Sequence, residues 1–232
     1  QMRLDVSAYY TLVQGLMTRR AFSLPDGSNL VKVDGEWYET RANVNAKKGI
    51  IYGWSGEVQA RLGSHWELRS NLNFVQGNSL FEVKDDQGLV VFDTLAPLDH
   101  IPPVHGFTSL TFQTKKLKFS ATARYQGKKT IEKYGVSDVS LDANGDPVLG
   151  RSGTEDNIEY SYSRLDESGK VTYDGTLAWT TWNFNASWKL TKWYSVNFAV
   201  ENIADLHYRP FASGVSAAGR NFIVSFRVNL SK

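Results

Sequence analysis

Apolar residues recur at every second position in several segments of this chain, and this period of two predicts β-strands with one apolar face. The segments with the pattern are residues 3–12, 50–62, 66–74, 104–112, 117–125, 182–188, 194–200 and 222–230. The last of them has the apolar positions Phe222, Val224, Phe226, Val228 and Leu230. The pattern predicts an all-β fold of about eight strands, each with one face suited to an apolar environment and the other suited to water.

The connections between the predicted strands alternate strictly between long and short. Short turns occupy residues 63–65, 114–116 and 190–192, whereas long polar connections occupy residues 18–49, 76–102, 127–177 and 203–219. We interpret the long connections as loops, the first of which carries a hairpin-like segment across Asp34-Gly35. Alternate connections of an antiparallel meander lie at opposite ends, so every long loop is expected at one end of the sheet. Outer-membrane β-barrels have this asymmetry, and a soluble sandwich has no reason to keep it.

The composition is compatible with a chain that faces lipid, since 41% of the 232 residues are hydrophobic and 13% are aromatic. No run of about 18 apolar residues is present, so the sequence predicts no transmembrane helix, although the strands of a barrel need no such run. The net charge of +2 argues against a nucleic-acid partner. The absence of cysteine excludes disulfides and cysteine metal sites. The chain begins at Gln1 without the pattern of a signal peptide.

The sequence shows no arrangement of residues typical of catalysis or of a resident metal. Its four histidines are scattered without the spacing of metal ligands, and residues 142–146 match a calcium loop only in part, so we interpret that segment as a turn. We therefore predict no enzymatic activity and no cofactor. The polar residues between the apolar positions leave two interpretations open, since they can line a wet lumen or form the solvated face of a sheet.

The stretch from Glu201 to Leu230 has the most specific pattern in the chain. It holds an Asn-Ile-Ala-Asp turn, a Tyr208-Arg209-Pro210 triplet, a run of small residues, and Gly219-Arg220-Asn221-Phe222 before the last strand. In order and spacing these elements resemble the C-terminal end of TonB-dependent outer-membrane receptors. Residues 97–106, PLDHIPPVHG, resemble the Pro-containing start of a strand in the same family, and the order of paired strands and loops is similar along the whole chain.

The resemblance implies a transmembrane, antiparallel, up-and-down β-barrel of about 22 strands with a plug domain inside it. Residues 1–232 would supply the C-terminal segment of that barrel, and the N-terminal plug and earlier strands are absent from the sequence. The implied location is the outer membrane of a Gram-negative bacterium. The implied partners are the plug and remaining strands of the same receptor, the TonB complex, outer-membrane lipid and a small-molecule or metal-chelate ligand. The chain departs from the family by ending in Leu230-Ser231-Lys232 rather than on an aromatic residue.

The function implied by the resemblance is the binding of a scarce nutrient, such as an iron–siderophore, haem or cobalamin, followed by TonB-coupled import. Long external loops would capture the ligand, so we expect its contacts in residues 127–177 and 203–219. The candidate ligand-binding residues are Tyr134, Asp156, Tyr160, Tyr162, His207, Tyr208 and Arg209. The same residues could instead serve only to fold the loops. The alternative hypothesis is a free-standing eight-stranded outer-membrane barrel with an adhesin, structural or enzymatic role.

Overall fold

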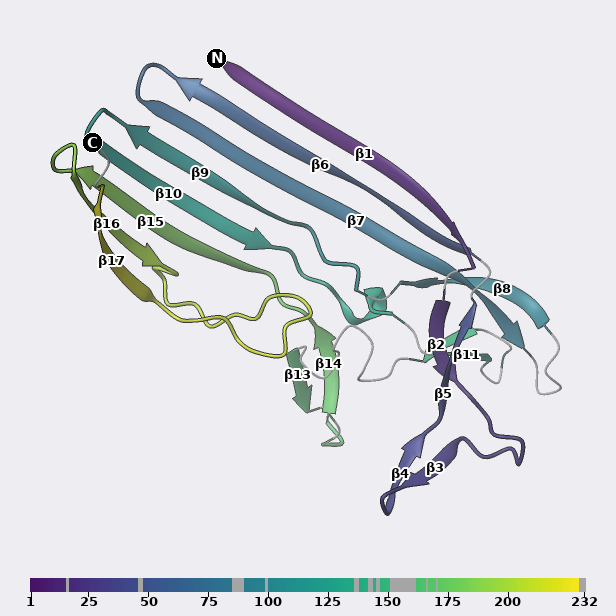
Figure 1. Cartoon of the computed structure of the whole chain (residues 1–232). Coiled ribbons are helices and arrows are strands. Elements are labelled where there is room, and N and C mark those ends of the chain that lie inside the picture. Colours follow the sequence, from purple (N-terminus) through teal and green to yellow (C-terminus); the bar gives the residue numbers. More distant parts are fainter. Residues whose placement is uncertain are drawn as a thin grey trace.

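The computed structural model describes residues 1–229 except for residues 16, 46–47, 85–89, 99, 136–137, 142–143, 145–146, 151–161, 166 and 170. The fold is all-β, with one large antiparallel sheet and four two-stranded sheets (Figure 1). The helical part of the described chain is the three-residue 3-10 helix η1 (Ile131–Lys133). Among the described residues, no helix is long and apolar enough to cross a membrane.

The large sheet contains the eight strands that the sequence predicts, in the predicted order. Its path runs through β1 (Met2–Gln14), β6 (Lys48–Leu62), β7 (Trp66–Lys84), β9 (His105–Gln113), β10 (Leu117–Gln126), β15 (Trp179–Lys189), β16 (Tyr194–Glu201) and β17 (Asn221–Val228). Short turns join β6 to β7, β9 to β10 and β15 to β16, and they lie at one end of the sheet (Figure 1). The predicted alternation of long and short connections is therefore confirmed, and the long connections define the loop end of the sheet.

Strand register places the predicted apolar positions on a single face of the large sheet, the apolar face. Directly opposed residues of neighbouring strands lie on the same face of a sheet. One row of opposed residues crosses six strands and is wholly apolar: Leu68, Leu110, Ala121, Phe184, Val200 and Phe222. On this face Phe119 stacks between Phe112 and Phe184, with ring centroids 6.5 and 6.3 Å apart. The division into two faces that the periodicity predicts is confirmed by these pairs.

The apolar face is exposed rather than packed into a core. Val224 and Phe226 are 60% and 78% exposed, and the buried apolar side chains of the described residues are Ala60, Ala96 and Tyr134. A soluble domain covers such a face, because a large exposed apolar patch is unfavourable in water. This sheet therefore needs an apolar environment on that side, and lipid around a transmembrane barrel supplies one.

The opposite, polar face of the large sheet carries side chains that hydrogen-bond from strand to strand. Arg69 Nε donates to Glu57 Oε1 at 2.8 Å. The Ser109 hydroxyl lies 3.0 Å from the hydroxyl of Ser120 and 2.9 Å from that of Thr122. Cross-strand pairs of this kind contribute about 0.2–1 kcal/mol each to the stability of a sheet. The polar positions thus form one connected surface suited to water or to a polar partner.

The first long connection is more ordered than the sequence suggests. β3 (Leu30–Val33) and β4 (Glu36–Glu39) form the predicted hairpin. Its central residues Asp34 and Gly35 have φ angles of 51° and 92°, and positive φ at both positions is typical of a two-residue type I′ turn. β2 (Met17–Ala21) also pairs with β5 (Arg41–Asn45), which corrects the interpretation of residues 18–49 as a loop. That pairing escaped prediction because MTRRA in β2 has no alternation of apolar and polar residues.

The long connections at residues 76–102 and 127–177 also contain strands, which corrects their interpretation as loops, whereas residues 203–219 contain no strand. β7 continues past Phe74 and pairs with β8 (Val90–Pro97). In the next connection β11 (Asp138–Leu141) pairs with β12 (Pro147–Gly150), and β13 (Tyr162–Leu165) pairs with β14 (Val171–Gly175). Gly and Asp are common in hairpin turns and in irregular loops, so composition alone does not distinguish the two. Residues 142–146, the partial calcium-loop match, lie mostly outside the described residues.

Both edges of the large sheet are open. β1 pairs with β6 and β17 pairs with β16, and these two edge strands do not pair with each other. They lie on opposite sides of the sheet in Figure 1. An edge strand presents unpaired backbone N–H and C=O groups, which lipid cannot satisfy. A free-standing eight-stranded barrel would require pairing between β1 and β17, and the structure lacks that pairing.

Candidate functional site

The loop between β16 and β17 is held at its base by Asn202. This side chain is 3% exposed. Its Nδ2 donates to the carbonyl oxygens of Leu206 at 2.8 Å and Ala218 at 3.2 Å, and its Oδ1 accepts from the Leu206 N–H at 3.0 Å. The Asn202 N–H donates to Asn183 Oδ1 on β15 at 3.0 Å. One asparagine therefore ties the two ends of the loop to each other and to a neighbouring strand.

A second contact closes the same loop where β17 begins. Asp205 Oδ1 accepts from the Arg220 N–H at 2.7 Å, and Arg220 Nε donates to the Ile203 carbonyl at 2.9 Å. A Cβ at Gly219 would come within 2.7 Å of Asp205 Oδ1, so a larger residue there would displace the carboxylate that accepts from the Arg220 N–H. The Asn-Ile-Ala-Asp and Gly-Arg-Asn-Phe elements of the sequence therefore act as one clamp on residues 203–219.

The clamped loop folds back over the loop end of β10 and β15. The Phe211 N–H donates to Gln126 Oε1 at 3.1 Å. The rings of Tyr208 and Trp179 lie 4.4 Å apart between centroids, tilted by 43°. Gln126 and Trp179 are directly opposed in strand register, so the two contacts are made side by side. The loop is therefore fixed at its centre as well as at its base.

A buried lysine lies between this loop and two other long connections. Lys129 is 3% exposed, and its Nζ donates to the Ile101 carbonyl at 2.8 Å. The same Nζ lies 4.6 Å from the ring centroid of Tyr134 and 4.3 Å from that of Phe211, within the range of cation–π attraction. The Tyr134 and Phe211 rings meet edge to face at 6.1 Å, and the Tyr134 hydroxyl hydrogen-bonds with the Thr176 hydroxyl at 2.5 Å. These contacts join the three connections into one support.

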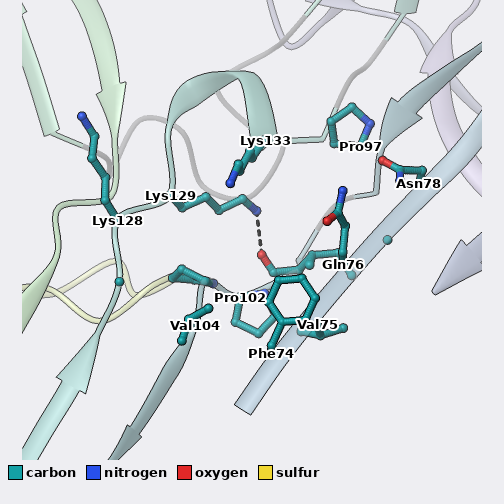
Figure 2. A pocket seen from close by; sticks show the side chains of 14 residues that line it. Phe74, Val75, Gln76, Asn78, Pro97, Pro102, Val104, Lys128, Lys129 and Lys133 are labelled. Atoms are coloured by element: carbon teal, nitrogen blue, oxygen red, sulfur yellow. Dashed lines mark hydrogen bonds between the residues drawn. The ribbon is translucent and has the colours of Figure 1, made fainter. Parts of the chain in front are cut away.

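An open pocket of about 190 Å³ lies beside Lys129 (Figure 2). It occupies the place where the partner of β7 changes, since β9 pairs with β7 up to Asn73 and β8 pairs with it from Asn78. The lining combines apolar and basic side chains, including Phe74, Pro102, Val104, Lys128, Lys129 and Lys133. Sites for drug-sized molecules measure about 300–1,000 Å³, so this pocket accommodates a small group rather than a whole chelate.

The structure places the predicted ligand-binding residues in different environments. Tyr134 is 1% exposed and packs inside the loop support, whereas His207 is exposed and its Nε2 lies 3.3 Å from the Ser216 hydroxyl. Tyr208 and Arg209 are half-buried. Phe211 connects Tyr134 to the loop that carries His207, Tyr208 and Arg209, because the Phe211 ring packs against the Tyr134 ring.

The remaining predicted residues fall on the connection between β10 and β15. Asp156 and Tyr160 lie outside the described residues. Tyr162 begins β13, and its backbone pairs with Gly175 of β14. Ligand contact by the seven candidate residues stays a prediction.

Sequence reasoning missed four residues that organise this end of the sheet: Gln126, Lys129, Trp179 and Asn202. Only Asn202 had a signal, because it belongs to the turn in the C-terminal pattern. The other three lie where strands end, and nothing in their spacing shows that they meet. In the described part of the chain, no group of three or more His, Asp or Glu side chains could hold a metal ion.

No protein-family model and no curated protein matches this sequence. Solved structures do match it over nearly its whole length. The copper transporter OprC matches 98% of the chain with a TM-score of 0.62 and 13% identity. The FrpB iron transporter from Neisseria meningitidis matches 98% with a TM-score of 0.58 and 13% identity. The ferric enterobactin receptor PfeA from Pseudomonas aeruginosa matches 97% with a TM-score of 0.53 and 18% identity.

These matches define the class of fold. The chain spans 29%, 29% and 28% of the three matched chains, so it corresponds to part of each. Together with the open antiparallel sheet and its exposed apolar face, they show that this chain has the fold of part of a TonB-dependent outer-membrane receptor barrel. The matched structures are transporters and receptors for copper, iron and ferric enterobactin.

Proposed function

We propose that these residues form the C-terminal part of the barrel of a TonB-dependent outer-membrane receptor, which binds a scarce nutrient and imports it. The observation that carries the proposal is the single exposed apolar face, which crosses the sheet from strand to strand. The loop end of the same sheet carries elaborate, hydrogen-bonded connections, whereas the other end has only short turns. A membrane protein that captures ligands from outside needs this division.

Each surface of the sheet then has its own proposed partner. Outer-membrane lipid contacts the apolar face, and the plug domain and lumen water contact the polar face. The remaining strands of the receptor pair with β1 and β17, whose outer edges are open. The TonB complex acts on the plug rather than on these residues.

Ligand capture is proposed for residues 127–177 and 203–219, the connections that the Lys129 and Asn202 contacts hold together. His207, Tyr208 and Arg209 lie on a loop fixed at its base and centre. A loop that is already ordered loses less conformational entropy when it binds a ligand. Tyr134 supports that loop through Phe211, and Asp156, Tyr160 and Tyr162 are proposed contacts on the neighbouring connection.

Uptake by the full-length protein tests this function. The protein is produced in a Gram-negative host without its own receptors, and uptake of labelled copper, ferric siderophores, haem and cobalamin is measured with and without TonB. We expect uptake of one of these nutrients, and only when TonB is present. Uptake that persists without TonB, or no uptake of any of the nutrients, would contradict the proposal.

A further inference from the structure

Two buried hydrogen-bond donors lie side by side beneath the loop between β16 and β17. Gln126 Nε2 and Trp179 Nε1 are buried, and neither has a hydrogen-bond partner among the described residues. Gln126 is 8% exposed. The two residues are directly opposed on β10 and β15, so they share a face of the sheet. Buried polar groups are nearly always satisfied in proteins, so an adjacent pair without partners requires an explanation.

The orientation of the glutamine amide is set by its surroundings. Gln126 Oε1 accepts from the Phe211 N–H at 3.1 Å, and rotating the amide would place its NH₂ group against that donor instead. Nε2 is therefore the free end of Gln126. The indole Nε1 of Trp179 can only donate. Both free groups are donors, so the group that satisfies them must be an acceptor.

The loop between β16 and β17 lies over these two donors. The ring centroids of Tyr208 and Trp179 lie 4.4 Å apart, and the Phe211 N–H donates to Gln126 Oε1. At the base, Asn202 and Asp205 keep the two ends of the loop together. Between these anchors Ser213 and Val215 contact each other, and Val215 is 73% exposed. Tyr208 and Phe211 therefore cover Gln126 and Trp179, whereas the exposed tip of the loop around Val215 does not contact them.

We propose that Gln126 and Trp179 form a two-donor site for a carboxylate group beneath the Tyr208–Phe211 segment. A carboxylate oxygen accepts two hydrogen bonds, and bonds to a charged acceptor are about twice as strong as neutral ones. The proposal deepens the proposed function, on which it rests, by naming a ligand chemistry for the loop between β16 and β17.

The indole N–H of Trp179 reports on the site directly. In the full-length protein labelled with ¹⁵N-tryptophan, Trp179→Phe identifies its resonance among those of the other tryptophans. Citrate is titrated against sodium chloride of equal ionic strength. We expect the Trp179 resonance to move downfield with citrate and to stay in place with chloride. Trp182, which lies on the apolar face of the same strand and is 55% exposed, serves as the control and should not respond.

Two substitutions of Gln126 test whether its amide donates to the carboxylate. Gln126→Leu removes one donor and should weaken the response to citrate about tenfold. Gln126→Glu supplies a carboxylate next to Trp179 and should shift the resonance without citrate. The proposal would be overturned if citrate did not move the Trp179 resonance, which is the result expected if an ordered water fills the site. It would also be overturned if Gln126→Leu responded to citrate as strongly as the unchanged protein. Normal nutrient uptake with an unresponsive indole would refute this site alone, whereas absent uptake with a responsive indole would refute only the proposed function.

Discussion

Asn202 stabilises the loop between β16 and β17 through its backbone as well as its side chain. Its φ of 48° lies in the left-handed region, which asparagine and glycine adopt more readily than other residues. The side chain then satisfies three backbone groups of the loop. This double requirement gives a physical reason for asparagine at that position.

Two substitutions of Asn202 should separate the contribution of its side-chain hydrogen bonds to stability from that of its backbone conformation. Asn202→Ala loses the hydrogen bonds and the favourable backbone conformation, and should lower the free energy of unfolding by about 2–4 kcal/mol. Asn202→Gly loses the same bonds but tolerates φ of 48°, so its cost should be about 1 kcal/mol smaller. Denaturant unfolding of the full-length protein measures both values, and proteolysis within residues 203–219 should increase in both variants. Equal losses would show that the backbone conformation contributes nothing.

The two faces of β16 should respond differently to the same substitution. Phe198 lies on the apolar face and Asn197 on the polar face, beside an open hollow of about 300 Å³. Phe198→Arg should cost about 2–4 kcal/mol if the position lies near the membrane midplane, because it places a charge in lipid. Asn197→Arg should cost far less, since the hollow accommodates the longer side chain. Folding in lipid vesicles measures both, and equal losses would mean that the faces are assigned wrongly.

At the scale of elements, β10 and β15 form a hairpin whose strands are joined by a long connection. Ten opposed pairs, from Leu117 with Trp188 to Gln126 with Trp179, hold the two strands together. Their pairing is continuous and does not require the connection itself. The connection adds Lys129 and Tyr134, which support the neighbouring loop rather than the sheet.

Shortening this connection should therefore separate folding from ligand capture. Residues 127–177 are replaced by a Gly-Asn turn in the full-length protein. Loop-closure entropy depends weakly on loop length, so the barrel should still form and reach the outer membrane at normal abundance. Nutrient uptake should fall to background, because the proposed contacts are removed. Shortening the β2–β5 connection instead provides a matched control for loop removal, and unchanged uptake in the first variant would exclude residues 127–177 from the site.

At the scale of the whole molecule, the open edges make this sheet dependent on further strands. β1 extends over 13 residues with one side unpaired, and β17 is unpaired on its outer side. In lipid each unsatisfied backbone group costs several kcal/mol, so the sheet cannot span a membrane with these edges exposed.

Residues 1–232 alone should therefore fail to form a barrel in detergent. The measurement is electrophoresis with and without boiling, because a folded outer-membrane barrel migrates differently from its unfolded chain. The full-length protein should shift on boiling, and the isolated residues should not. A compact, protease-resistant species formed by residues 1–232 alone would instead support closure between β1 and β17, and with it the free-standing barrel.

The period of two predicted eight of the nine strands of the large sheet, their order and the two faces of each strand, whereas β8 was missed. These properties follow from a period of two and from the lengths of the connections, both of which are local. The C-terminal pattern singled out the stretch that holds Asn202, Asp205 and Gly219, but the contacts between these residues were not predicted. The small hairpins in the long connections were less readable, since Gly and Asp are common to hairpin turns and irregular loops.

The contacts between residues at the loop end follow from tertiary packing and from no local pattern in the sequence. Phe211 and Gln126 are 85 positions apart, yet they hydrogen-bond because β10 and β17 belong to the same sheet and the loop folds back across it. The contact of Lys129 with Phe211 and that of Trp179 with Tyr208 arise in the same way. Periodicity reports the side of a strand on which a residue lies, whereas the neighbours of a loop residue depend on how separate connections pack against one another.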